Sequence, residues 1–277
     1  MNDDRETKRM YCELLEADLS IDLEKDLSPP PVAITFGTHE YKTSKGTIIE
    51  ETPMATYGNF SFIQAPPKSY KSYFVSLLAS VYLKSENKWA GEKFKSYSNG
   101  KRLLHFDTEQ GAWHCQRGAR RIAEMAGTSD KYESYALRTI PYKERMDFID
   151  YKIWQNEDDD IGLVIIDGLA DLVGDVNDID QSNKCVQKLM EWSAKRGCHI
   201  VTVIHSNYGS DKPTGHLGSF CEKKAETQIS LEKDENTNLI QVKCKRSRNF
   251  SFSTFDFKIN NYGFPEVINQ AFPDLPF

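Results

Sequence analysis

The sequence lacks the features that mark secreted, zinc-binding or membrane-spanning proteins. Its six cysteines lie far apart and form no C-x-x-C pair, so neither a zinc motif nor a redox motif is supported, and scattered reduced thiols in a cytoplasm are the simpler interpretation. No apolar run approaches about 18 residues and the N-terminus is polar, so we expect no membrane span and no signal peptide. The net charge of −6, from 35 basic and 41 acidic residues, argues against a protein that coats nucleic acid by bulk charge, but not against a local basic patch.

The 277 residues suffice for one large α/β domain with appendages, and a hydrophobic content of 39% allows a full core. Residues 1–27 have leucines at helical spacing amid acidic charge, which predicts an amphipathic helix that ends before the three prolines at 29–31. Short strands are expected at 32–37 and 46–51. We interpret residues 1–57 as an N-terminal arm that could bind a protein partner.

Residues 58–277 are predicted to form the main domain. Strands are expected at 60–65, 102–107, 161–168 and 199–206, with helices at 72–85, 113–127 and 182–197. This alternation predicts an α/β fold with a mainly parallel sheet flanked by helices. After Gly218, segments 226–234, 238–246 and 250–259 alternate with period two and predict antiparallel strands that extend the sheet.

The segment APPKSYKS, residues 65–72, lies between a predicted strand and a predicted helix, where a phosphate-binding loop would lie. It ends in Lys71 and Ser72, but Ala65 and Tyr70 stand where the pattern G-x-x-x-x-G-K-[ST] has glycine. In such loops the lysine reaches the β- and γ-phosphates of a nucleotide and the hydroxyl binds Mg²⁺. We expect Lys71 to make the main phosphate contact and Lys68 to add charge.

The anion-binding capacity of such a loop comes from backbone N–H groups at its end and from the helix dipole. These groups are present throughout the critical end, which comprises Ser69, Tyr70, Lys71, Ser72 and, in the first helical turn, Tyr73. The side chain of Tyr70 is the main departure, because it could strain the turn or crowd the phosphates. Taken alone, the segment is compatible with a nucleotide site or with a structural turn.

Polar residues follow three other predicted strands. Asp167 ends an apolar strand, as does the carboxylate that holds Mg²⁺ in a Walker B element, although a strand-capping role is also common. Gly168 follows it, so no adjacent acid is available to polarise the attacking water, and Glu109, just past strand 102–107, could supply one. His205 ends strand 199–206 at the same edge, the ligand-binding edge of a parallel sheet.

This order of loop lysine, strand-end Glu, Walker B Asp and strand-end His resembles the RecA-like P-loop ATPases. Specifically, it resembles the RepA-like hexameric helicase ATPases of plasmids and mobile elements, over about residues 58–260. FDTEQ, LVIIDGLADL and VTVIHSN followed by GHLGS carry the resemblance. The resemblance implies ATP and Mg²⁺ as ligands, with Glu109 as general base, Asp167 as magnesium carboxylate and His205 as phosphate sensor. That family includes members with lysine-rich, glycine-poor loops.

Two further segments are candidates for partner contacts. KCKRSR, residues 243–248, is the densest basic cluster, and the resemblance implies that Arg246 or Arg248 completes a neighbouring subunit's site; a solvated face that balances nearby acids is the alternative. Residues 206–219 form a predicted glycine-rich loop in which Lys212 and His216 could contact DNA, or which could be a flexible surface loop.

The sequence therefore predicts a cytoplasmic ATPase of RecA-like fold that forms a homo-oligomeric ring, which could be hexameric, and acts on DNA, single-stranded rather than double-stranded. Its expected setting is the replication or mobilisation of a genetic element. The alternatives are a nucleotide-binding regulator that hydrolyses little ATP and recruits a DNA-processing partner, and a scaffold whose loop binds no nucleotide.

Overall fold

The computed structural model describes residues 2–155, 160–206 and 212–268, and the chain divides into two compact units, Met1–Pro30 and Pro31–Phe277. In the first unit, helix α1 spans Asn2–Leu19. It ends earlier than the predicted residue 27, well before the prolines. Apolar side chains such as those of Met10, Leu14 and Leu19 are exposed in the structure.

The second unit begins with strands β1 (Val32–Thr43) and β2 (Gly46–Thr56), which form an antiparallel sheet with β4 (Phe94–Ser96). Ile34, Phe36 and Met54 are buried in the core of this unit. Strands β1 and β2 therefore belong to the same compact unit as the main sheet.

The main sheet has a parallel part and an antiparallel part. The parallel strands are β3 (Phe60–Ala65), β5 (Arg102–Asp107), β6 (Tyr132–Ala136), β7 (Ile161–Asp167) and β8 (His199–His205). Strand β9 (Thr227–Lys233) pairs in parallel with β3, and the antiparallel strands β10 (Ile240–Ser247), β11 (Phe255–Ile259) and β12 (Pro265–Ile268) follow it.

Within the described residues the strand order is β12-β11-β10-β9-β3-β8-β7-β5-β6. The predicted mainly parallel sheet with C-terminal antiparallel strands is confirmed. Strand β8 lies between β3 and β7. The segments that follow these three strands are therefore neighbours at the carboxyl edge of the sheet.

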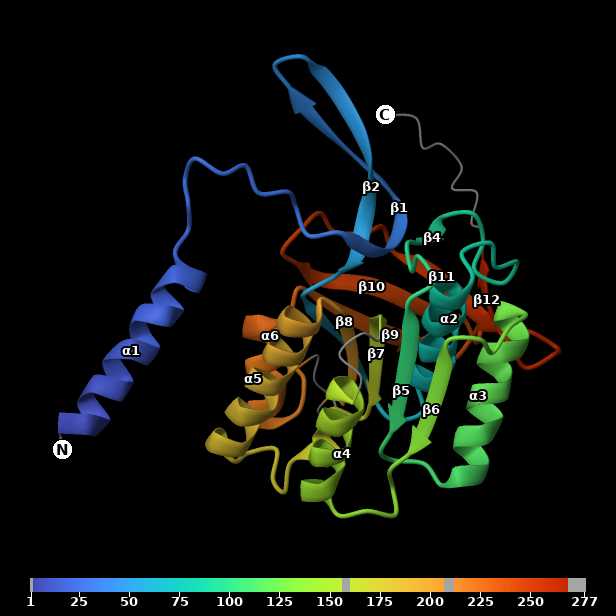
Figure 1. Ribbon diagram of the computed structural model, residues 1–277. Coiled ribbons are helices and arrows are strands. Elements are labelled where there is room, and N and C mark those ends of the chain that lie inside the picture. The colour runs from blue at the N-terminus through green and yellow to red at the C-terminus, as the bar shows by residue number, and fades with distance from the viewer. Residues whose placement is uncertain (1, 156–159, 207–211, 269–277) are drawn as a thin grey trace. The chain divides into compact units, whose positions relative to one another are not determined.

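Helices cover both faces of the sheet (Figure 1). Helices α2 (Lys71–Leu83) and α3 (Ala112–Ala126) contribute to one apolar core. Helices α4 (Tyr142–Trp154), α5 (Ile179–Arg196) and α6 (Gly215–Lys224), with the short 3₁₀ helix η1 (Leu169–Leu172), contribute to the other. No helix in the described part of the chain is long and apolar enough to cross a membrane.

Local signals explain where two of these helices end. Gly127 follows α3 with φ 69° and Gly197 follows α5 with φ 61°, the left-handed conformation that glycine adopts at low cost. Helix α5 begins after Asp178, whose Oδ1 accepts a hydrogen bond from the Gln181 N–H at 2.9 Å. The ends of α3 at Gly127 and of α5 at Gly197 agree with the sequence prediction.

Candidate nucleotide-binding site

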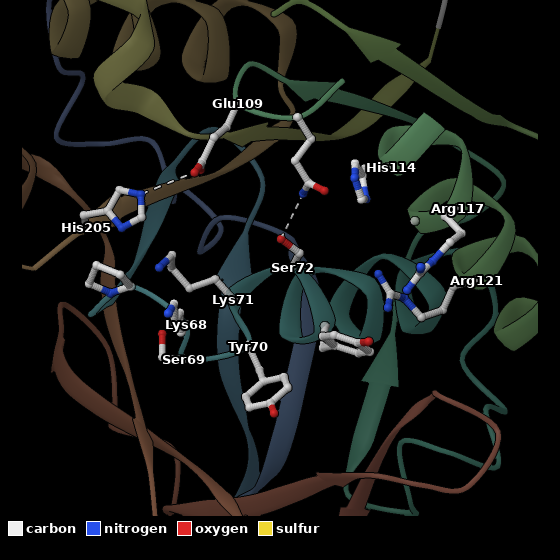
Figure 2. Close-up of a pocket in the computed structure, with 14 residues that line it drawn as sticks. Lys68, Ser69, Tyr70, Lys71, Ser72, Glu109, His114, Arg117, Arg121 and His205 are labelled. Atoms are coloured by element: carbon white, nitrogen blue, oxygen red, sulfur yellow. Dashed lines mark hydrogen bonds and ion pairs between the residues drawn. The ribbon is translucent and has the colours of Figure 1, made fainter. Parts of the chain in front are cut away.

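The carboxyl ends of β3, β8, β7 and β5 bring four predicted site residues to one edge of the sheet. Lys71 starts α2 after β3, His205 ends β8, Asp167 ends β7 and Glu109 follows β5. A cavity of about 550 Å³ opens at this edge, and Figure 2 shows Lys71, Glu109 and His205 facing it from three segments. Lys68, Ser69, Tyr70, Ser72 and Tyr73 also line it.

The loop before α2 includes left-handed backbone conformations without glycine. Lys68 and Tyr70 both have φ 62°, in the left-handed region that glycine normally fills. A non-glycine residue there costs on the order of 1 kcal/mol. The hydroxyl of Ser69 donates to the Pro66 carbonyl at 2.6 Å, which helps to hold the turn. The strain expected at Tyr70 is therefore present.

Lys71 is buried at the base of the cavity, with 9% of its surface exposed. Its Nζ donates to the carbonyl of Pro66 at 2.9 Å and lies 3.5 Å from that of Ala65. Burial lowers the pKa of Lys71, and the charges of Asp167 and Glu109 oppose this effect. The ammonium group is thus held by the carbonyls of its own loop and faces two acidic residues.

Ser72 and Asp167 present the oxygen ligands that Mg²⁺ prefers. Ser72 Oγ lies 3.4 Å from Asp167 Oδ2, and Gln110 Nε2 lies 3.4 Å from the same hydroxyl. Asp167 is 6% exposed, and burial, with the charges of Asp107 and Glu109, raises its pKa to about 7. A buried carboxylate beside a hydroxyl favours a cation, and Mg²⁺ is commonly held by one or two protein oxygens plus phosphates. The residues therefore fit the ion, which when bound would neutralise phosphate charge.

The segment after β5 positions Glu109. Asp107 Oδ1 accepts the N–H groups of Glu109 at 3.0 Å and Gln110 at 2.8 Å. Thr108 Oγ1 accepts the Gly168 N–H at 3.1 Å and lies 2.9 Å from Asp171 Oδ2, which fastens this segment to the end of β7. The strand-end positions of β5 and β7 are therefore coupled by side chains.

Glu109 is paired with the predicted sensor. Its Oε2 lies 3.7 Å from His205 Nε2 (Figure 2). The interaction with His205 lowers the pKa of Glu109, burial opposes this, and the charges of Lys71 and Arg138 lower it further. The carboxylate is therefore ionised near neutral pH, as a general base must be.

Helix α3 contributes a basic wall that the sequence analysis did not assign to the site. His114, Arg117 and Arg121 line the cavity opposite the loop, at the i, i+3 and i+7 positions of one helix face. Arg121 Nε donates to Ser76 Oγ at 3.1 Å, and its guanidinium lies 4.0 Å from the ring centroid of Tyr73. The sequence shows the helical spacing of these basic residues, but it does not show that they lie close to α2.

The residues expected to contact a neighbour lie outside the cavity lining. Arg246 and Arg248 are exposed, and Arg248 Nη2 donates to the Lys224 carbonyl at 2.9 Å. The pairing of β10 with β9 shifts register between Cys244 and Arg246. The regular alternation of side chains between the two faces of β10 is therefore interrupted within this basic cluster.

The predicted loop 206–219 is partly helical. Residues 207–211, including Gly209, lie outside the described residues, and Lys212 and His216 are exposed, the latter in α6. A Cβ at Gly215 would lie 2.6 Å from the Val176 carbonyl oxygen, and one at Gly218 would lie 2.6 Å from Pro213 Cβ. These two glycines allow close packing against Val176 and Pro213.

The fold and the strand-end residues define a P-loop ATPase fold of the RecA-like class. The chain belongs to the AAA domain family, whose model matches residues 50–211, more than half of the sequence. No curated protein matches the sequence.

Two solved structures share this fold. One is an ATPase domain, with a TM-score of 0.54 and 14% identity over 76% of this chain and 85% of its own. The other is the RadB recombinase, with a TM-score of 0.53 and 14% identity over 76% of this chain and 91% of its own. These likenesses confirm the predicted RecA-like fold.

Proposed function

We propose that this protein binds and hydrolyses ATP and acts on DNA as a helicase or translocase in the replication or mobilisation of a genetic element. The observation that carries the proposal is the convergence of Lys71, Ser72 and Glu109 around one cavity, with Asp167 3.4 Å from the Ser72 hydroxyl. Each of these groups suits one part of a phosphoryl-transfer site.

In this mechanism the loop N–H groups and Lys71 would hold the β- and γ-phosphates, and Ser72 and Asp167 would hold Mg²⁺. Glu109 takes the proton of a water molecule as its oxygen attacks the γ-phosphorus, and the bond to the β-phosphate oxygen breaks to release ADP. His205, which contacts Glu109, responds to the change in charge at the γ-phosphate.

The proposed motor works as a ring. Arg246 or Arg248 would reach a neighbour's γ-phosphate, which fits their exposure and their location outside the subunit's own cavity. Exposed Lys212 and His216 follow β8, whose end carries His205, so a DNA contact there would lie close in the chain to the phosphate site. One structural neighbour is a recombinase, which supports a role on DNA.

A nucleotide-binding regulator with little hydrolysis is the second candidate. Two observations favour it: Lys71 is engaged by its own loop carbonyls, and Tyr70 is strained where a P-loop normally has glycine. Such a protein would bind ATP and recruit a DNA-processing partner, for which the exposed apolar side chains of α1 offer a surface.

Measured phosphate release tests the proposal. The parent protein should hydrolyse ATP, and Glu109→Gln should bind ATP with unchanged affinity but turn it over about 100- to 10,000-fold more slowly, the range for loss of a general base. Glu144→Gln, an exposed acid at the start of α4, is the matched control and should retain the parent rate. Hydrolysis by Glu109→Gln at the parent rate would contradict the role, and ATP binding without hydrolysis in the parent would favour the regulator.

A further inference from the structure

Tyr70 keeps a bulky side chain at a position where the backbone favours glycine. It has φ 62° and ψ 28° at the N-cap of α2, and 36% of its surface is exposed. Glycine would adopt this conformation at little cost. Within the described residues Tyr70 belongs to neither apolar core, so core packing does not account for the strain. A strained residue that lines a ligand cavity is a candidate for a functional role.

We propose that Tyr70 is a specificity-determining residue whose ring stacks on the base of the bound nucleotide. This inference rests on the proposed function, because it assumes that the phosphates bind at Lys71 and Ser72. The ligand class it selects is a phosphorylated purine, which offers a large planar face for stacking.

The direction of the side chains supports this assignment. Figure 2 shows the Tyr70 ring and the Lys71 ammonium on different sides of the loop, so the ring does not fill the space next to Lys71 where phosphate would bind. Glu109 and His205 mark the end of the cavity where the γ-phosphate is attacked. The ribose and base of the nucleotide must then extend away from these two residues, along the first turn of α2.

The aromatic surroundings leave the Tyr70 ring available. Its centroid lies 5.6 Å from that of Tyr73, and the two planes meet at 62°, so the two rings are not stacked face to face. Tyr73 is itself covered by the Arg121 guanidinium at 4.0 Å. Lys233 Nζ lies over one face of the Tyr70 ring, 5.8 Å from its centroid, so a base would stack on the opposite face. Tyr73 thus supports the ring, and Tyr70 offers the exposed aromatic surface.

The test compares ATP with inorganic tripolyphosphate, both with Mg²⁺, by isothermal titration of the full chain. Tyr70→Gly should weaken ATP binding about 5- to 100-fold, the effect of losing one aromatic–base stack, and change tripolyphosphate binding less than about twofold. Tyr70→Phe keeps the ring and should keep the parent affinity for ATP. The glycine variant should fold, because its backbone conformation suits glycine.

Lys68→Gly is the matched control, because Lys68 shares the φ of 62° but has no ring. It should change the affinities for ATP and tripolyphosphate by the same factor. If Tyr70→Gly changes the affinity for both ligands equally, or strengthens ATP binding, the ring does not stack on the base and the inference is overturned. If Lys71→Ala changes neither ligand's affinity, the phosphate site itself is wrong and the proposed function fails with it.

Discussion

Protonation of His105, in the strand that leads to Glu109, makes the stability of the folded protein depend on pH. It lies in β5, is 7% exposed, and its Nδ1 lies 3.1 Å from the Tyr132 hydroxyl, while Nε2 is buried without a hydrogen-bond partner. Burial lowers its pKa to about 4 from the ordinary 6.5. The folded protein therefore binds this proton less readily than the unfolded chain does.

The sign and size of the effect follow from linkage. Above pH 6.5 the imidazole of His105 is neutral in the folded and the unfolded protein, so it makes no pH-dependent contribution to stability. Below pH 6.5 the unfolded chain binds the proton more readily, so the free energy of unfolding falls as the pH falls. The loss from this one group is about 2 kcal/mol at pH 5 and about 3 kcal/mol near pH 4. Asp107 and Asp167 have raised pKa values and act in the opposite direction, so the effect must be read as a difference between variants.

The assay is urea unfolding at pH 8, 7, 6 and 5 for the parent and for His105→Gln, which removes the titrating group and keeps a partner for Tyr132. Between pH 8 and pH 5 the parent should lose about 2 kcal/mol more than the variant. His216→Gln replaces an exposed histidine and should behave as the parent does. Identical pH dependence in the parent and in His105→Gln would show that His105 does not cause the loss of stability in acid.

Two further predictions concern assembly and DNA. A mixture of Arg246→Ala/Arg248→Ala protein with Lys71→Ala protein should regain part of the ATPase activity, because some interfaces then pair an intact loop with intact arginines. If the protein is a monomer by light scattering and still has full activity, this prediction is contradicted. Binding of single-stranded DNA should require ATP and weaken as the salt concentration rises. Lys212→Ala should reduce the magnitude of the slope of log affinity against log salt by about 1 per lost phosphate contact. An unchanged slope would remove Lys212 from the contact.

The parallel sheet was predictable because mostly apolar segments alternate with helical ones, and several of these segments end in a polar residue. The run at 161–166 ends in Asp167 and the run at 200–204 ends in His205, so pattern alone placed both side chains at one edge. Helix α4 was missed because only Ile149 and Ile153 of its thirteen residues are buried, which gives too weak a helical pattern to detect.

The parts of the site that were missed depend on contacts between distant segments. The basic wall of α3 belongs to the cavity only because α3 packs beside α2, which brings Arg121 to Ser76. The close approach of Gly215 to Val176 and of Gly218 to Pro213 could not be inferred from spacing either. The left-handed backbone of Tyr70 was expected as strain, but the direction of its ring was not.

The proposed function requires that the loop from Ala65 to Ser72 bind the phosphates of ATP, although Ala65 and Tyr70 replace its glycines. Titration of ATP with and without Mg²⁺ into the parent, Lys71→Ala and exposed Lys68→Ala proteins tests it most directly. The parent should bind ATP more tightly with Mg²⁺. Lys71→Ala should weaken binding about 10- to 100-fold, the effect of losing a charge-assisted hydrogen bond, and Lys68→Ala should weaken it less. Equal and negligible effects of the two substitutions would contradict the claim.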